Sequence, residues 1–285
     1  MASRALLPTA ALLVLGWVAS ARAEDAAKYT FRYRFQAGEV LRWNVLHRCE
    51  VRTSVSGTVQ TAETTTASTK AWRVREVAPD GTATFDHVVE NVDMRHRLTG
   101  RDEVHYNSRT DLHPPPGFEN VAQAVGLPLS VFKMTSKGRV IERKQNPIKA
   151  AVPSQGELTI PLPEEAIAVG HQWSYPHKIE VPLPGGGVRQ IQSLQTFTLQ
   201  GVQTGVASIR VTTQILTPMA DPALESQLLQ YETSGIVRFD LDAGRVLDQQ
   251  MDVDKGVVGF RGEASSIHYR GRFTEEFMVS EARHG

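Results

Sequence analysis

The sequence predicts an all-β protein made of long antiparallel meanders, with one or two short helices. Apolar and polar residues alternate over long runs, which is the pattern of strands with one buried face. Turn signals such as Ser56-Gly57 and Pro79-Asp80-Gly81 separate these runs. Apolar residues make up 41% of the chain and charged residues 22%, which is ordinary globular usage. We expect the strands to form a curved sheet, a half-open barrel or a sandwich.

The predicted strands begin near residue 29. Four aromatic residues alternate with polar ones over residues 29–36, and Ala37-Gly38 ends this run. The apolar face of the next strand carries Leu41, Trp43, Val45, His47, Cys49 and Val51. Residues 58–69 are rich in threonine and are predicted to be an exposed strand or a hairpin arm. Residues 72–77 and 82–94 are predicted to be the two strands of a hairpin.

The regular pattern then breaks. Pro114-Pro115-Pro116-Gly117 continues neither a strand nor a helix, and residues 120–125 could form a short helix. Two further strands, at residues 129–134 and 139–142, flank a Lys137-Gly138 turn. A proline-containing connector follows. Later strands are expected at residues 172–181, 192–199, 207–215, 231–241, 246–253 and 265–278, with a second short helix at 221–229.

An internal echo suggests two similar halves. Three segments recur in the same order: Gly38 to Trp43 resembles Gly170 to Trp173, Trp72 to Val77 resembles Phe197 to Val202, and Phe132 to Val140 resembles Phe239 to Val246. Duplication of one meander explains this order, and chance similarity of turns and aromatic strands is the alternative. The predicted units are a first half at residues 28–145, a connector at 146–165 and a second half at 166–280.

The first residues have the pattern of a secretory signal peptide. A short basic region ends at Arg4, an apolar run covers residues 5–18, and Ala21-Arg22-Ala23 is a cleavage signal. We expect residues 1–23 to be removed after Ala23 and the mature protein to be secreted or periplasmic. An uncleaved anchor is the alternative, but the run is shorter than the roughly 20 residues that span a bilayer. No later segment is apolar enough to span one, so no transmembrane span is expected after cleavage.

Several turn and strand motifs resemble those of an uncharacterised family of secreted bacterial β-rich proteins. They are Tyr33 to Glu39, Leu162-Pro163, Gly170 to Trp173, Gly235 to Asp240, and Gly244-Arg245. The resemblance would cover most of residues 28–278. It implies a β-rich fold and export, and it supplies no catalytic residues. His171 stands where the family would have an acidic residue.

The composition and motifs argue against several functions. The 31 basic and 31 acidic residues balance, whereas nucleic-acid binders usually have a basic excess. No nucleophile motif, cofactor motif or compact metal pattern is present, so we expect neither an enzyme nor a cofactor. The strings Asp240 to Gly244 and Asp252 to Gly256 suggest calcium, but their glycine spacing and flanking strands favour turns. The enzyme alternative is a hydrolase that uses the irregular loop at residues 96–118.

The leading hypothesis is an exported, non-enzymatic protein that binds a hydrophobic small molecule or an envelope component. Long strands with one apolar face must bury that face on another layer or on a ligand. The residues predicted to line a cavity are Trp43, Trp72, Phe197 and Ile209. In architecture alone this resembles the lipid-carrying half-barrels of the bacterial envelope. The alternative is a structural module that assembles through strand edges near residues 58–69.

Overall fold

In the computed structural model, residues 27–146, 158–183 and 186–279 are described, and all that follows concerns them. The first half of the chain forms β1 (Lys28–Tyr29), β2 (Val40–Val55), β3 (Thr58–Val77), β4 (Ala83–Leu98), β5 (Val104–Asn107), β6 (Pro128–Met134) and β7 (Val140–Gln145). The second half forms β8 (Ile167–Ala168), β9 (Gln172–Pro182), β10 (Val188–Gln203), β11 (Val206–Ile215), β12 (Ser234–Asp240), β13 (Arg245–Val258) and β14 (Ser265–Phe277). The short helices are α1 (Glu119–Ala124), α2 (Pro222–Ser226) and a 3-10 turn at Leu229–Tyr231.

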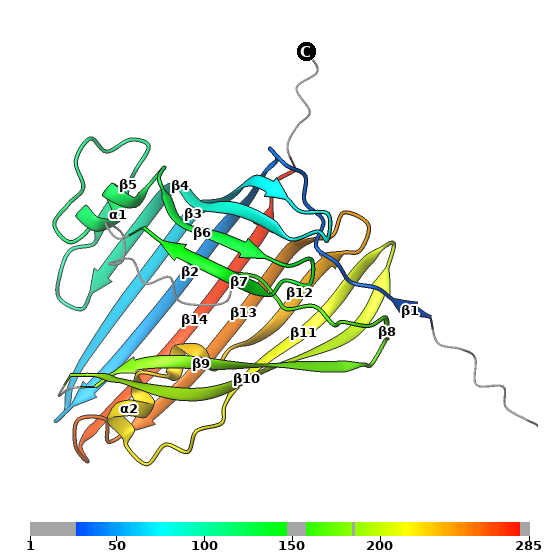
Figure 1. Cartoon of the computed structure of the whole chain (residues 1–285). Helices are drawn as coiled ribbons and strands as arrows, with labels where there is room; N and C mark the ends of the chain where they lie inside the picture. The colour runs from blue at the N-terminus through cyan, green and yellow to red at the C-terminus, as the bar shows by residue number, and fades with distance from the viewer. Residues whose placement is uncertain (1–26, 147–157, 184–185, 280–285) are drawn as a thin grey trace, which may run out of the picture.

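All strands except β1 and β8 belong to one 12-stranded antiparallel sheet. Across it the order is β7-β6-β4-β3-β2-β14-β13-β12-β11-β10-β9, and β5 pairs with β4. The sheet curves strongly, so that β9 and β10 on one side and β6 and β7 on the other lie in front of the central strands (Figure 1). It does not close, because β7 and β9 end the order unpaired with each other. The all-β curved sheet predicted from the sequence is confirmed.

The two halves of the chain join along β2 and β14. Each half is a meander whose strands follow one another across the sheet, and the β2–β14 pair links them over 13 paired positions, from Val55 opposite Ser265 to Trp43 opposite Phe277. The segments that echo in the sequence occupy corresponding places, with β2 matching β9, β3 matching β10 and β6 matching β12. Duplication itself remains a prediction.

The sheet has an apolar inner face and a polar outer face. We call the face that carries Trp43 the inner face. It is the concave face of the curved sheet, because Trp43 shares one buried cluster with Phe132 on β6 and Phe197 on β10, from the two arms of the sheet that lie in front of the central strands in Figure 1. Residues directly opposite each other on antiparallel strands share a face, so Lys70 on β3 and Phe277 on β14, both opposite Trp43, are inner-face residues. Alternation then places Arg42 and Asn44 on the outer face.

One end of the inner face is filled by the segment at residues 30–36 and the segment at 158–163. Phe31 is fully buried, with its ring centroid 5.8 Å from that of Phe239 and 6.2 Å from that of Trp173. Tyr33 donates a hydrogen bond of 3.0 Å from its hydroxyl to the carbonyl of Ile160, and burial raises the pKa of the phenol. We call this region the filled end.

The strand predicted at residues 29–36 is wrong, because only Tyr29 of this run lies in a strand, β1, which pairs with β8 in a separate two-stranded sheet. The alternation of apolar and polar residues nevertheless has a structural meaning. It directs Phe31 and Tyr33 into the core and leaves Arg32 and Arg34 exposed. The segment is extended but lies across the inner face, where it packs through side chains instead of strand pairing.

Two turns that echo each other in the sequence hold this segment. The amide of Tyr33 donates to the carbonyl of Ser136 at 2.7 Å, and that of Arg34 donates to the carbonyl of Gly244 at 3.0 Å. Gly138 and Gly244 both have positive φ, 79° and 64°. A Cβ on Gly138 would lie 2.6 Å from the carbonyl oxygen of Ile160, and one on Gly244 the same distance from Cγ of Arg34. Only glycine permits this close approach.

Two further expectations need correction. Residues 58–69 are not a sheet edge, because they belong to β3, which pairs with β2 along its length and with β4 from Ala62 onwards. At the two ends of the strand order lie β7, rich in charged residues, and β9, which contains Pro176 and Pro182, and both features discourage edge pairing. Residues 252–256 are not a turn, because they lie within β13. Their aspartates face outwards and pair with Arg272 and Arg270.

Both predicted helices are present as short elements, α1 and α2. Asp221 caps α2 by accepting a 2.9 Å hydrogen bond from the amide of Ala223. Over the described part of the chain, none of the helices has the length and apolar character needed to cross a membrane.

Candidate functional site

The four residues predicted to line a cavity all lie in the packed core. Each is at most 2% exposed. The rings of Trp43 and Trp72 are 4.8 Å apart, Phe197 stacks on Trp173 at 5.4 Å, and Ile209 lies on β11 among the same buried residues. Trp43 and Trp72 also border a space of about 10 Å³, enough for about one water molecule. These residues therefore build the filled end, and contact with a ligand remains a prediction for them.

Beyond the filled end, part of the inner face is again fully buried, at Val253 and Val257 and in a second cluster with α2 formed by Ile179, Val181, Ile191, Leu224 and Leu228. Between these two buried regions lies an apolar wall that is only half-buried. We call it the open wall. Its apolar members come from β2, β4, β13 and β14 and are Val45, Cys49, Val51, Met94, Met251, Ile267, Tyr269 and Phe273. Their shared face follows from register, since Phe273 lies opposite both His47 and Met251, and Tyr269 lies opposite Val51. The alternation in β2 that the sequence shows thus extends to three further strands.

The aromatic ring of Tyr269 covers a glycine in the open wall. Gly271 lies opposite Cys49, and a Cβ on it would lie 2.9 Å from the Tyr269 ring. Burial raises the pKa of the Cys49 thiol and that of the Tyr269 phenol, so both groups are neutral at pH 7. A neutral thiol is a poor nucleophile, and the wall here is chemically inert.

A buried ion pair marks the boundary between the filled end and the open wall. The ammonium of Lys70 contacts the carboxylate of Glu275, with side-chain exposures of 12% and 4%. The same nitrogen lies 4.7 Å from the ring centroid of Trp43 and 5.0 Å from that of Trp72, which are cation–π distances. Gln249 donates a 3.0 Å hydrogen bond to the second carboxylate oxygen. The sequence analysis missed this pair.

A second polar feature lies beside it, on one row across three strands. His87 on β4 lies opposite Trp72 on β3 and opposite Ser130 on β6, so the three share the inner face. The His87 ring packs near Phe132, with centroids 6.2 Å apart. Burial, together with the positive charges of Lys70 and Arg143, lowers the pKa of His87 to about 3. His87 is therefore neutral at physiological pH.

This lowered pKa predicts that His87 makes its own contribution to the acid sensitivity of the fold. In the unfolded chain His87 titrates near 6.5, so between pH 6.5 and 3 the unfolded state binds a proton that the native state does not. His87 is expected to lower the free energy of unfolding by about 1.4 kcal/mol per pH unit as pH falls below 6.5.

Urea unfolding of wild type and His87→Phe at pH 7 and pH 5 measures this effect. The free energy of unfolding lost on acidification should be about 2 kcal/mol smaller in the variant than in wild type. A control, His171→Phe, removes an exposed histidine and should keep the wild-type loss. Equal losses in all three proteins would contradict the prediction.

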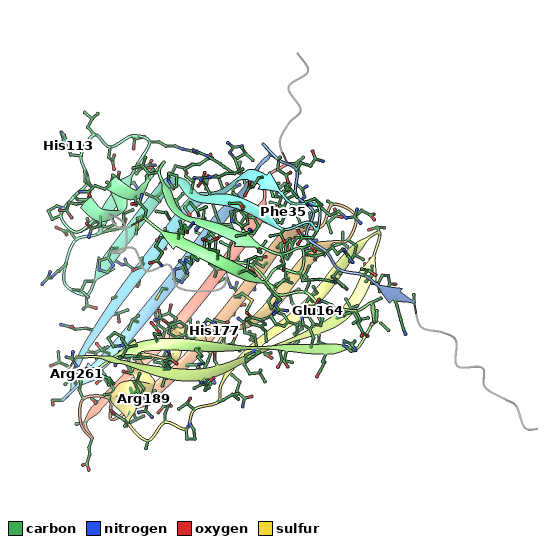
Figure 2. The ribbon with its side chains drawn as sticks, in the orientation of Figure 1. Phe35, His113, Glu164, His177, Arg189 and Arg261 are labelled. Carbon is green, nitrogen blue, oxygen red and sulfur yellow. The ribbon has the colours of Figure 1, made fainter. Side chains whose placement is uncertain are left out.

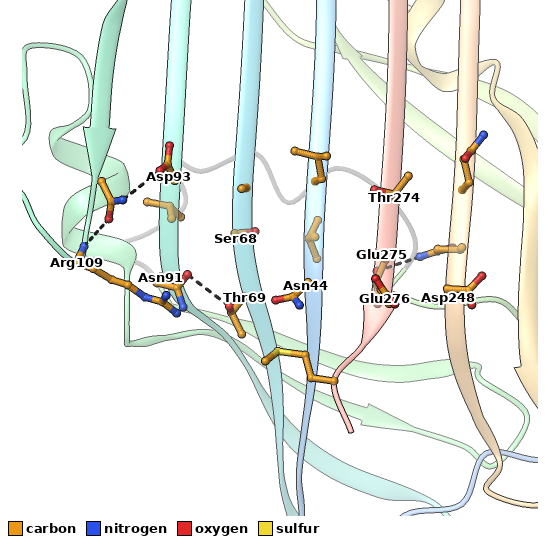
Figure 3. Close-up of a pocket in the computed structure, with 18 of the residues that line it drawn as sticks. Asn44, Ser68, Thr69, Asn91, Asp93, Arg109, Asp248, Thr274, Glu275 and Glu276 are labelled. Atoms are coloured by element: carbon orange, nitrogen blue, oxygen red, sulfur yellow. Dashed lines mark hydrogen bonds between the residues drawn. The ribbon is translucent and has the colours of Figure 1, made fainter. Parts of the chain in front are cut away.

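The outer face carries a separate, polar groove of about 820 Å³. Its floor crosses neighbouring strands, with Glu276, Asn44, Thr69 and Asn91 on one row (Figure 3). Thr69 donates to the Asn91 side chain at 3.4 Å, and Asp248 at the far side accepts from Nε of Arg238 at 2.7 Å. Carboxylates, amides and guanidinium groups alternate there and satisfy one another. Leu46, Ala67 and Met278 also line the groove, so it presents apolar as well as polar surface.

The loop at residues 96–118 does not bring its histidines together. His96 lies on the inner face with its Nδ1 3.1 Å from the hydroxyl of Thr64, whereas His105 lies opposite Arg95 on the outer face and contacts Asp93 at 2.9 Å. His113 is exposed at the tip of the loop, away from the sheet (Figure 2). Among the described residues, no group of three or more His, Cys, Asp or Glu side chains could hold a metal ion. Asp93 also accepts a 3.1 Å hydrogen bond from the Asn107 amide, so His105 belongs to a small outer-face network that His96 and His113 do not join.

Comparison with known proteins adds little beyond the architecture. No family model matches this sequence, and no curated protein matches it. Among solved structures, the chain is similar to lipovitellin in a structure concerned with lipid–protein interactions, at 13% sequence identity and a TM-score of 0.45. The match covers 88% of this chain and 26% of that one, so this chain spans about a quarter of the length of the protein it matches.

Proposed function

We propose that this protein is an exported, non-enzymatic carrier that holds a hydrophobic ligand against its inner face. The observation that carries the proposal is the open wall, an apolar surface that runs on from a packed core and is left half-exposed. Burying apolar surface is favourable by about 25 cal/mol per Å², so such a face is stabilised by an apolar occupant. The signal-peptide pattern at residues 1–23 supports export.

The residues of the open wall suit an alkyl or similar apolar chain. Met94 and Met251 adapt their shape to irregular partners, and Phe273 offers a large flat contact. The backbone N–H and C=O groups in this part of the sheet are engaged in strand pairing on both sides, so a ligand need not form hydrogen bonds with them. Polar groups cluster instead at the boundary with the filled end, around Lys70 and His87.

The test combines native mass spectrometry with binding of an apolar fluorescent dye. We expect the mature protein, purified from a secreting host, to carry or take up an apolar species. Phe273→Asp places a charge on the open wall and should weaken dye binding at least tenfold, since full burial of an aromatic side chain is worth about 1.5–3 kcal/mol. Thr274→Asp, one residue further on the same strand but on the outer face, is the matched control and should bind as wild type does.

Folding of each variant is checked by circular dichroism and thermal melting, with Phe273→Ala as the milder substitution should the aspartate prevent folding. Equal dye affinity in Phe273→Asp, Phe273→Ala and Thr274→Asp would contradict the proposal. So would a wild-type protein that neither copurifies with an apolar species nor binds the dye.

A further inference from the structure

Two buried polar atoms on the inner face lack partners. Within the described part of the chain, Nε1 of Trp72 and Oγ of Ser130 make no hydrogen bond. Both residues are almost fully buried, at 2% and 3% exposure. An unsatisfied buried polar group costs about 1–3 kcal/mol, and native proteins contain few of them. Two such atoms, on the two strands that flank β4, therefore indicate a missing partner.

The two atoms belong to one row, with His87 between them. Trp72 and Ser130 both lie opposite His87, on either side of β4. Directly opposed residues on antiparallel strands have Cβ atoms about 4.5–5.5 Å apart. Both unpartnered atoms are closed to solvent in the structure, so a small group above His87 would contact them once neighbouring side chains move aside. His87 retains partial exposure, which leaves an approach from the interior of the curved sheet.

The chemistry of this row is that of a hydrogen-bond donor site. The indole of Trp72 can only donate, and the Ser130 hydroxyl and the neutral imidazole of His87 can each donate one hydrogen. Lys70 and Arg143 are close enough for their positive charges to act on His87. Donors surrounded by positive potential favour an anionic acceptor with oxygens in one plane, which is the geometry of a carboxylate.

We propose that Trp72, His87 and Ser130 form the headgroup site of the carried ligand and that the ligand class is a long-chain fatty acid. This inference rests on the proposed function, because the alkyl chain would lie on the open wall. The three residues lie at the boundary between the filled end and the open wall. Along β4, the seven residue steps from His87 to Met94 extend for roughly 23 Å, and both ends lie on the inner face. That length accommodates an extended long alkyl chain.

The experiment compares two ligands that share a chain and differ in the headgroup, hexadecanoic acid and hexadecanol. Each displaces the apolar dye from wild type, Ser130→Ala, Trp72→Phe and the control Ser174→Ala, an exposed serine on β9. Wild type and the control are expected to prefer the acid at least tenfold. Ser130→Ala and Trp72→Phe should each weaken acid binding about fivefold and leave alcohol binding within twofold. The pKa of His87, followed by NMR of the imidazole, should rise when the acid binds, because a carboxylate favours the charged ring.

The outcomes separate this inference from the proposed function. Equal affinity of wild type for acid and alcohol would overturn the headgroup assignment and leave the carrier proposal standing. The same holds if both substitutions weaken the two ligands alike, or if the pKa of His87 does not move. A protein that binds neither ligand nor the dye would overturn both.

Discussion

Replacement of Phe31 by alanine is expected to lower the free energy of unfolding by about 3–5 kcal/mol, the usual cost of truncating a buried phenylalanine. Phe31 is fully buried between Trp173 of β9 and Phe239 of β12. The surrounding strands are fixed by their own pairing and can move little to fill the space. The effect should exceed that of most single changes, because Phe31 lies on a segment that no sheet pairing retains. Urea unfolding followed by tryptophan fluorescence measures it.

The matched control is Leu112→Ala, which removes a large apolar side chain that is 93% exposed. It should change the free energy of unfolding by no more than about 0.5 kcal/mol. A loss below 1 kcal/mol in Phe31→Ala would show that residues 30–36 do not pack as described.

Removal of the positive charge of Lys70 is the second large expected effect. Lys70→Met leaves the carboxylate of Glu275 buried without its cation, which typically costs about 3–5 kcal/mol. The double variant Lys70→Met/Glu275→Gln should recover most of this loss, because a neutral amide replaces the unpaired charge and still accepts from Gln249. Chemical unfolding of the two single variants and the double variant completes the thermodynamic cycle.

An exposed ion pair on the outer face provides the comparison. Arg272 contacts Asp252 at 2.6 Å, with side-chain exposures of 57% and 40%, and Arg272→Met should cost less than about 1 kcal/mol. The interpretation of Lys70 and Glu275 as a structural pair fails if Lys70→Met costs no more than Arg272→Met, or if the double variant is less stable than both single variants.

Local sequence patterns predicted the long strands of the sheet and missed the short strands β5 and β8. Strict alternation in β2 identified its buried face, and the turns at Gly81, Gly138 and Gly244 lie between strands as expected. The same rule misassigned residues 29–36, because alternation reports one buried face and not whether a neighbouring strand supplies hydrogen bonds. The turn predicted at Asp252 to Gly256 was wrong for a related reason. Aspartate and glycine are common in turns, but aspartates also suit the outward face of a strand when arginines on the neighbouring strand pair with them.

The polar groups of the candidate site could not be predicted from the sequence, for a different reason. Lys70 and Glu275 are 205 residues apart, and their contact depends on the register of β3 with β2 and of β2 with β14. The row of Trp72, His87 and Ser130 likewise requires two registers, and both contain register shifts. A shift of one residue in any of these pairings would turn the side chains to the outer face. Sequence alternation alone does not set register between distant strands.

The segment at residues 31–36 has a consequence for the order in which the molecule assembles. It is among the first parts of the described chain to be synthesised, yet Phe31 and Arg34 contact Phe239 and Gly244, which follow more than 200 residues later. β2 likewise pairs with β14, which is synthesised more than 200 residues after it. Contacts between such distant residues are slow to form. The early half of the chain therefore stays incomplete, with apolar strand faces uncovered, until nearly the whole polypeptide is available. During that interval, protection from aggregation must come from outside the molecule.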